Sequence, residues 1–154
     1  MRHLLISDFN ISGDPIPNHV ANMIYTYHQY PLNRINECTS LDVFPSFDTF
    51  GQPSAWRPRW WEKKRGRSGD SQHCFGEKED GTFDVENGKG ACDITCDDFQ
   101  KNKWDLVKAL LDYSTYTRLA IYNTFIHADY KHKGSRTQIF ESGSDSKWKF
   151  LEVR

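Results

Sequence analysis

Two histidines and one aspartate carry the side chains best suited to chemistry in this sequence. His73 lies in "SQHCFG", Asp93 in "GACDI" and His127 in "FIHADY". Two imidazoles and one carboxylate form a chemically sensible zinc site with a fourth position left for water. Their spacings of 20 and 34 residues match no helical pair of ligands of the HExxH type, so the fold must bring them together. These three residues are therefore candidate ligands of one metal ion, Zn²⁺, although their spacing alone does not prove a site.

The four cysteines offer a second kind of chemistry. Cys38, Cys74, Cys92 and Cys96 form no CxxC pair, so a structural zinc knuckle is not expected. Without a secretion signal, free thiols are favoured over disulfides. Cys74 lies beside His73 and could form a catalytic Cys/His pair, but no other feature of the sequence supports one.

Composition limits the classes of partner. The chain has 154 residues, the length of one domain, and a formal net charge of −1. This balance gives no global electrostatic case for binding nucleic acid or an anionic membrane. Six basic residues between positions 57 and 67 form a local patch, which is either a solvated surface or a region that attracts an anionic polymer. A nucleic-acid-binding module built on residues 56–67 is the weakest hypothesis, because no recognised motif accompanies it.

The sequence predicts neither a membrane-spanning segment nor a signal peptide. No apolar run approaches the ~20 residues that cross a bilayer. The opening "MRHLLISDFN" has an apolar stretch too short for a signal peptide.

Periodicity predicts an α+β fold, because helices come first, then strands, one long helix and more strands. Val20, Ile24 and Tyr27 share a helical face, and Pro31 interrupts the pattern, so two short helices or one kinked helix are expected. The other predicted elements are a strand with an irregular return in 41–56, a loop or hairpin in 77–90, a strand in 91–95, a helix in 95–114, one or two strands in 118–131, and an antiparallel pair in 136–142 and 147–154 joined by 143–146.

Four short motifs in order carry a family resemblance over nearly the whole chain. They are "SAWRP" at 54–58, the Ser-x-His of residues 71–73, "GACDI" at 90–94 and the His-x-Asp within "FIHADY" at 125–130. Together they resemble the zinc D-Ala-D-Ala carboxypeptidases and the related phage or bacterial murein endopeptidases. The resemblance implies a single domain over residues 1–154, with N-terminal helices packed on a small antiparallel sheet, as in the hedgehog signalling domain.

The resemblance also implies a function. A zinc-dependent peptidase of this family would hydrolyse peptidoglycan stem peptides or cross-links. Because no signal peptide is expected, a monomeric phage lysin is predicted, located in the host cytoplasm or in the virion and acting on the cell wall. The alternative is a catalytically inactive relative that serves as a structural or binding protein of a phage particle.

The resemblance also implies roles for four further residues. Arg57 is expected near the developing oxyanion or as a clamp for a substrate carboxylate. Ser71 and Gln72 are expected to support His73 or to contact the substrate. Trp56 is expected to line the cleft, although core packing is the commoner fate of tryptophan.

The sequence departs from the family pattern at two positions. The family's aspartate follows the first histidine closely, at the place of Asp80, and Asp84 is a second rival; the motif around Asp93 fits better and requires an insertion. Many relatives carry a carboxylate as general base where this chain has Thr124. The nearest carboxylate is Asp129, which shares a strand face with His127 and could approach the metal or orient a partner.

Overall fold

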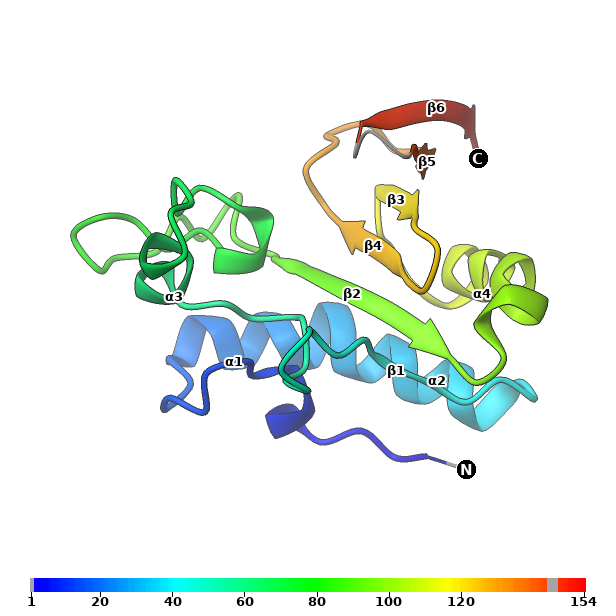
Figure 1. Cartoon of the computed structure of the whole chain (residues 1–154), viewed down its shortest axis with the longest axis horizontal. Helices are drawn as coiled ribbons and strands as arrows, with labels where there is room; N and C mark the ends of the chain where they lie inside the picture. Colours follow the sequence, from blue (N-terminus) through cyan, green and yellow to red (C-terminus); the bar gives the residue numbers. More distant parts are fainter. Residues whose placement is uncertain (1, 144–146) are drawn as a thin grey trace.

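The computed structural model describes residues 2–143 and 147–154, which form helices and one six-stranded mixed sheet of order β1-β2-β4-β3-β5-β6 (Figure 1). The predicted α+β class is confirmed. The elements are the short turns η1 (Ile6–Phe9) and η3 (Gln72–Cys74), the helices α1 (Asn18–Ile24), η2 (Tyr25–Gln29), α2 (Tyr30–Cys38), α3 (Arg59–Lys64) and α4 (Phe99–Tyr113), and the strands β1 (Val43–Pro45), β2 (Ala91–Cys96), β3 (Arg118–Ile121), β4 (Ile126–Asp129), β5 (Gln138–Ser142) and β6 (Trp148–Val153).

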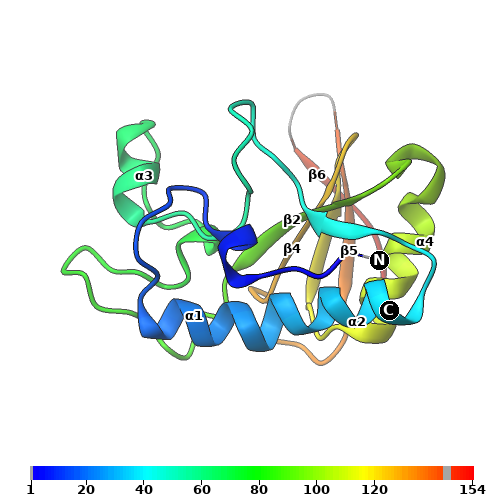
Figure 2. The ribbon, with the colours of Figure 1, turned by 90° about the horizontal axis from the view of Figure 1, so that it is seen from below.

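The N-terminal helical region is one continuous helix with a π-helical middle. Segments α1, η2 and α2 follow one another without a break, and Figure 2 shows them as a single rod below the sheet. Pro31 at the start of α2 has no N–H to donate to the preceding turn, and the wider π turn accommodates this loss. On the predicted apolar face, Val20 and Ile24 are inaccessible to solvent and Tyr27 is partly buried; Leu32 and Ile35 of α2 are inaccessible as well.

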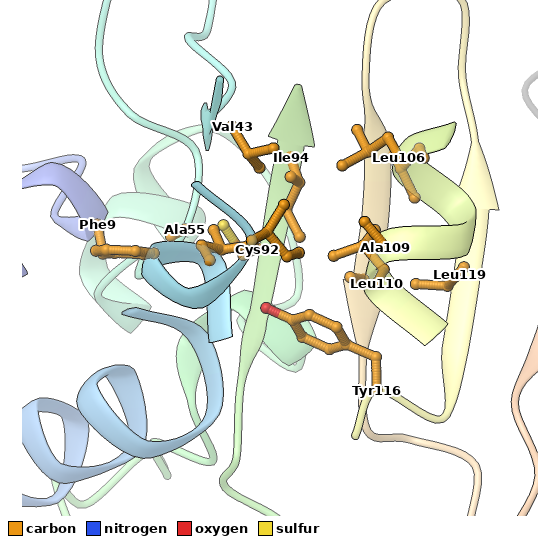
Figure 3. Close-up of a cluster of buried hydrophobic side chains, with 14 of the residues drawn as sticks. Phe9, Val43, Ala55, Cys92, Ile94, Leu106, Ala109, Leu110, Tyr116 and Leu119 are labelled. Carbon is orange, nitrogen blue, oxygen red and sulfur yellow. The ribbon is translucent and has the colours of Figure 1, made fainter. Parts of the chain in front are cut away.

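The hydrophobic core lies between the helices and one face of the sheet. Figure 3 shows Cys92 and Ile94 of β2 in the same cluster of buried side chains as Leu106 and Leu110 of α4. The α4 residues Leu106 and Leu110 are almost completely buried, as the helical periodicity predicted. Because side chains alternate along a strand, Asp93 lies on the opposite face of β2 from its two apolar neighbours.

The sheet is mixed, which corrects the prediction of an antiparallel sheet. Strand β2 pairs antiparallel with β1 and β4, and β3 pairs antiparallel with β4. After β4, however, the chain reverses direction, passes β3 and adds β5 on the far side of β3, so that β3 and β5 run parallel. The final pair β5–β6 is antiparallel as predicted; most of its predicted turn, residues 144–146, lies outside the described residues.

The register of the three central strands places four charged or titratable side chains in two facing pairs. Asp93 of β2 lies opposite His127 of β4, and Asp129 of β4 lies opposite Arg118 of β3. Residues directly opposite in an antiparallel pair share a face and have neighbouring Cβ atoms. The sheet thereby assembles these groups on the face turned away from the core.

Candidate metal centre

The three predicted ligands come together in the structure. The Oδ1 atom of Asp93 lies 3.3 Å from Nε2 of His73 and 3.0 Å from Nδ1 of His127. All three candidate ligand atoms lie within 4.8 Å of one another. The rivals Asp80, which is exposed, and Asp84, which is partly buried, lie in a loop, and their carboxylates accept hydrogen bonds from Thr82 and Asn87. The group that faces the two histidines is therefore Asp93.

A short turn fixes His73. The hydroxyl of Ser71 accepts a hydrogen bond from the His73 amide at 3.1 Å and so begins the turn η3. The ring atom Nδ1 of His73 donates to the carbonyl of Ala55 at 2.7 Å. Burial lowers the pKa of His73, which favours the neutral ring that a metal ligand requires. Its Nε2 atom faces the Oδ1 atom of Asp93.

One glycine holds this turn against β2. The ring of Phe75, directly after η3, packs on Gly90 at the start of the strand, where a Cβ atom would lie 2.3 Å from the ring. Gly90 also has a φ of +84°, which residues with a side chain rarely adopt. The glycine of the "GACDI" motif therefore sets the approach of His73 to Asp93.

The second carboxylate oxygen of Asp93 is held from behind. Oδ2 accepts hydrogen bonds from the Ser54 hydroxyl at 2.7 Å and from Nη2 of Arg57 at 3.3 Å. Burial alone would raise the pKa of Asp93, but the two histidines facing it hold the pKa well below the usual value. The other guanidinium nitrogen, Nη1 of Arg57, lies 3.6 Å from buried Glu62. Arg57 thus lines the site while its guanidinium contacts two protein carboxylates; its role toward a substrate stays a prediction.

His127 lies between two carboxylates. Its Nε2 atom lies 2.7 Å from Oδ2 of Asp129, and its Nδ1 atom faces Asp93. Burial opposes the charged form, but the hydrogen bonds to Asp129 and Asp93 outweigh it and raise the pKa of His127 to about 9. This carboxylate–histidine pair on the outer side is the arrangement that orients histidine ligands in metal sites.

Asp129 is placed to orient His127, which is one of the two roles that the sequence analysis gave it. The residue is inaccessible to solvent, and Nε of Arg118 donates to both of its carboxylate oxygens. Burial acts to raise the pKa of Asp129, but hydrogen bonds from His127 and Arg118 lower it to about 2. A carboxylate that is enclosed and occupied in this way cannot collect a proton from a reacting water.

The donor set fits a metal ion. Nε2 of His73 and Nδ1 of His127 both face Oδ1 of Asp93, at 3.3 Å and 3.0 Å, so one cation could contact two ring nitrogens and a carboxylate oxygen. Two ligands on a tetrahedral ion with bonds of about 2.0–2.1 Å lie roughly 3.3 Å apart. Each ligand is also hydrogen-bonded on its far side, to Ala55, Ser54 or Asp129.

The three residues open onto a pocket of about 410 Å³, named here the central pocket. Ser71 and Gln72 line it, and their contact with a substrate stays a prediction. Trp56 does not line it; the side chain is 2% exposed and belongs to the hydrophobic core, which corrects the prediction for this residue. The other lining residues are Arg57, Asp70, Arg118, Tyr122, Phe125, Lys131 and Trp148.

Sequence reasoning missed Trp148 of β6. Its ring centroid lies 5.4 Å from that of His127, its Nε1 atom donates to the hydroxyl of Tyr122, and Arg118 stacks on its ring. No short-range pattern marks this residue, because its place at the site depends on β5 and β6 joining the sheet beside β3.

No cysteine is among the three candidate ligands or among the residues that line the central pocket. All four are free thiols, as predicted, and Cys38 alone among them is exposed. Burial raises the pKa of Cys74 to about 12, so this thiol is not a nucleophile at neutral pH.

Comparisons of the chain with known proteins found no similar protein. No protein-family model, curated protein or solved structure matches the chain. Among the described residues, no helix is both long and apolar enough to span a bilayer.

Proposed function

We propose that this protein is a zinc-dependent peptidase that hydrolyses peptide bonds in peptidoglycan stem peptides or cross-links. The observation that carries the proposal is the position of Asp93 Oδ1 between His73 Nε2 and His127 Nδ1, with every ligand supported from behind. Three protein ligands beside an open pocket are characteristic of catalytic zinc, whereas structural zinc is usually enclosed by four. When bound, zinc polarises a carbonyl oxygen and lowers the pKa of water toward ~7.

The chain's own residues would hold and orient this centre. Asp129 and Arg118 fix the ring of His127, and the carbonyl of Ala55 fixes the ring of His73. The rings of Phe125 and Trp148 line the central pocket and would exclude bulk water from a bound peptide.

The general base is proposed to be Asp70. Thr124 occupies the place of the family's carboxylate, and its side chain has no acid function. Among the residues that the structure describes, Asp70 is the one carboxylate besides Asp93 that lines the central pocket. Its side chain is mostly exposed, and only its Oδ1 atom contacts Arg59, at 3.3 Å from Nη1. The other carboxylate oxygen of Asp70 is therefore available to take a proton from the attacking water.

The substrate class rests on the motif resemblance and on the charge near the site. Stem peptides and teichoic acids carry anionic groups, and the basic run of residues 57–67 borders the central pocket through Arg57. Attraction of this kind weakens as salt is added.

A second candidate function is a non-catalytic structural or binding protein of a phage particle. It is favoured by Thr124, because the carboxylate that acts as base in many relatives is missing there. Such a protein could keep the metal without hydrolysing peptides.

Two measurements test the proposal. Metal analysis after purification in zinc-replete buffer should give about one zinc per chain in the wild type and in His3→Ala, an exposed control histidine, and should give none in His73→Ala or His127→Ala. Incubation with purified sacculi should release new amino termini in a chelator-sensitive manner. A metal-free wild type would overturn the site; bound zinc without release from any wall type would favour the non-catalytic candidate.

A further inference from the structure

We propose that the metal centre lies in the middle of a groove that binds peptide on both sides of the scissile bond, so that the protein is an endopeptidase rather than a carboxypeptidase. This inference rests on the proposed function and specifies its substrate as an internal bond of an extended peptide.

Three adjoining pockets form the groove. The central pocket shares Arg57, Asp93 and Phe125 with a pocket of about 530 Å³, named here the aromatic pocket. On its other side the central pocket shares residues 70–72 with a third pocket of about 410 Å³, named here the loop pocket. Each of the three has the volume of an ordinary small-ligand site.

Both outer pockets reach the surface. The aromatic pocket is lined by Phe47 and Phe50, which are 57% and 76% exposed. The loop pocket is lined by exposed Glu79 and partly buried Asp84 of the insertion between η3 and β2. A peptide can therefore enter along one outer pocket, pass the metal ligands and leave along the other.

The central pocket offers no prearranged clamp for a terminal carboxylate. The guanidinium of Arg57 is engaged by Asp93, and that of Arg118 by Asp129. Lys131 is the remaining cation, and it is an exposed side chain whose ammonium has no anchoring hydrogen bond among the described residues. A carboxypeptidase depends on a rigid group that recognises the chain end.

The aromatic pocket carries a fixed cation instead. The guanidinium carbon of Arg65 lies 3.5 Å from the ring centroid of Trp61, and Nη1 of Arg65 donates to the Trp61 carbonyl at 3.2 Å. Neighbouring Arg67 is paired with Glu62, whereas no carboxylate in the described part of the chain pairs with Arg65. Arg65 is thus oriented to receive an acidic side group of the peptide at a distance from the bond that is cut.

The products of hydrolysis test the inference. Zinc-loaded protein is incubated with soluble cross-linked muropeptides prepared from Gram-negative and Gram-positive sacculi, and the products are identified by mass. Fragments cut within the peptide support the proposal. Release of free terminal alanine alone overturns it and leaves the proposed peptidase function intact. No product from any muropeptide overturns both.

The role of Arg65 in the aromatic pocket has a separate test. Arg65→Ala should raise KM for the cleaved muropeptide about tenfold and leave kcat unchanged, because the lost contact is made equally before and during reaction. Lys108→Ala, which removes an exposed cation on α4 remote from the three pockets, is the matched control. Equal KM values in the two variants would remove Arg65 from the peptide-binding groove.

Discussion

The buried histidine of the N-terminal helix should make the fold sensitive to acid. His28 lies in the π turn and is inaccessible to solvent. Its Nε2 atom donates to the Lys89 carbonyl at 2.7 Å, and its Nδ1 atom accepts from the Tyr116 hydroxyl at 2.7 Å. The neutral ring therefore satisfies both of its nitrogens, and protonation would place an uncompensated charge in the core.

The size of the effect follows from the pKa. Burial lowers the pKa of His28 from 6.5 to about 4. Because the folded chain resists a proton that the unfolded chain takes up, stability is complete above pH 6.5 and falls as the pH decreases toward 4. The linkage relation gives a loss of about 2 kcal/mol at pH 5 and about 3 kcal/mol below pH 4.

Urea unfolding of the wild type and His28→Gln, between pH 8 and pH 5 with chelator present, measures this loss. At pH 8 the variant should be less stable by about 1–3 kcal/mol, because it disturbs buried hydrogen bonds. At pH 5 the gap between the two proteins should shrink by about 2 kcal/mol, because only the wild type loses the contribution of His28. Other titrating groups affect both proteins equally. A gap that stays constant across this range would refute the reasoning.

Three further substitutions, with a fourth as a control, test the site and the packing that supports it. Asp129→Asn should weaken zinc binding about 10- to 100-fold in competition with a chromophoric chelator, and unchanged affinity would contradict its positioning role. Asp70→Asn should lower kcat on muropeptides about 100-fold or more with zinc content unchanged; full activity would exclude it as the base. Gly90→Ala should lower the free energy of unfolding by more than 2 kcal/mol through its clash with Phe75. Gly81→Ala, with the same φ of +84° and no atom within 4 Å, should cost only about 1 kcal/mol; equal costs would contradict the clash.

The sequence predicts those features that depend on short-range order. The apolar spacing of Val20, Ile24, Leu106 and Leu110 identifies the buried helix faces, because a helix repeats its environment every few residues. The motifs also identify the three candidate ligands, and the two-residue spacing of His127 and Asp129 correctly predicts that they share a strand face.

Long-range features could not be predicted in this way. The parallel pairing of β3 with β5 depends on the route of residues 130–137, which alternation along a strand does not encode. The engagement of Arg57 by Asp93 and Glu62 depends on three segments meeting in space. Trp56 was expected to line the cleft, but neighbours along an extended chain point in opposite directions, so Trp56 points into the core while Arg57 lines the central pocket.

The position of Trp148 separates two parts of the site by local stability. Trp148 belongs to β6, a largely exposed edge strand of the sheet, whereas Asp93 and His127 lie on the inner strands β2 and β4. Segments with few buried contacts open locally at a lower cost in free energy than the core of a sheet. The wall that Trp148 forms can therefore open while the candidate ligands on β2 and β4 stay in place.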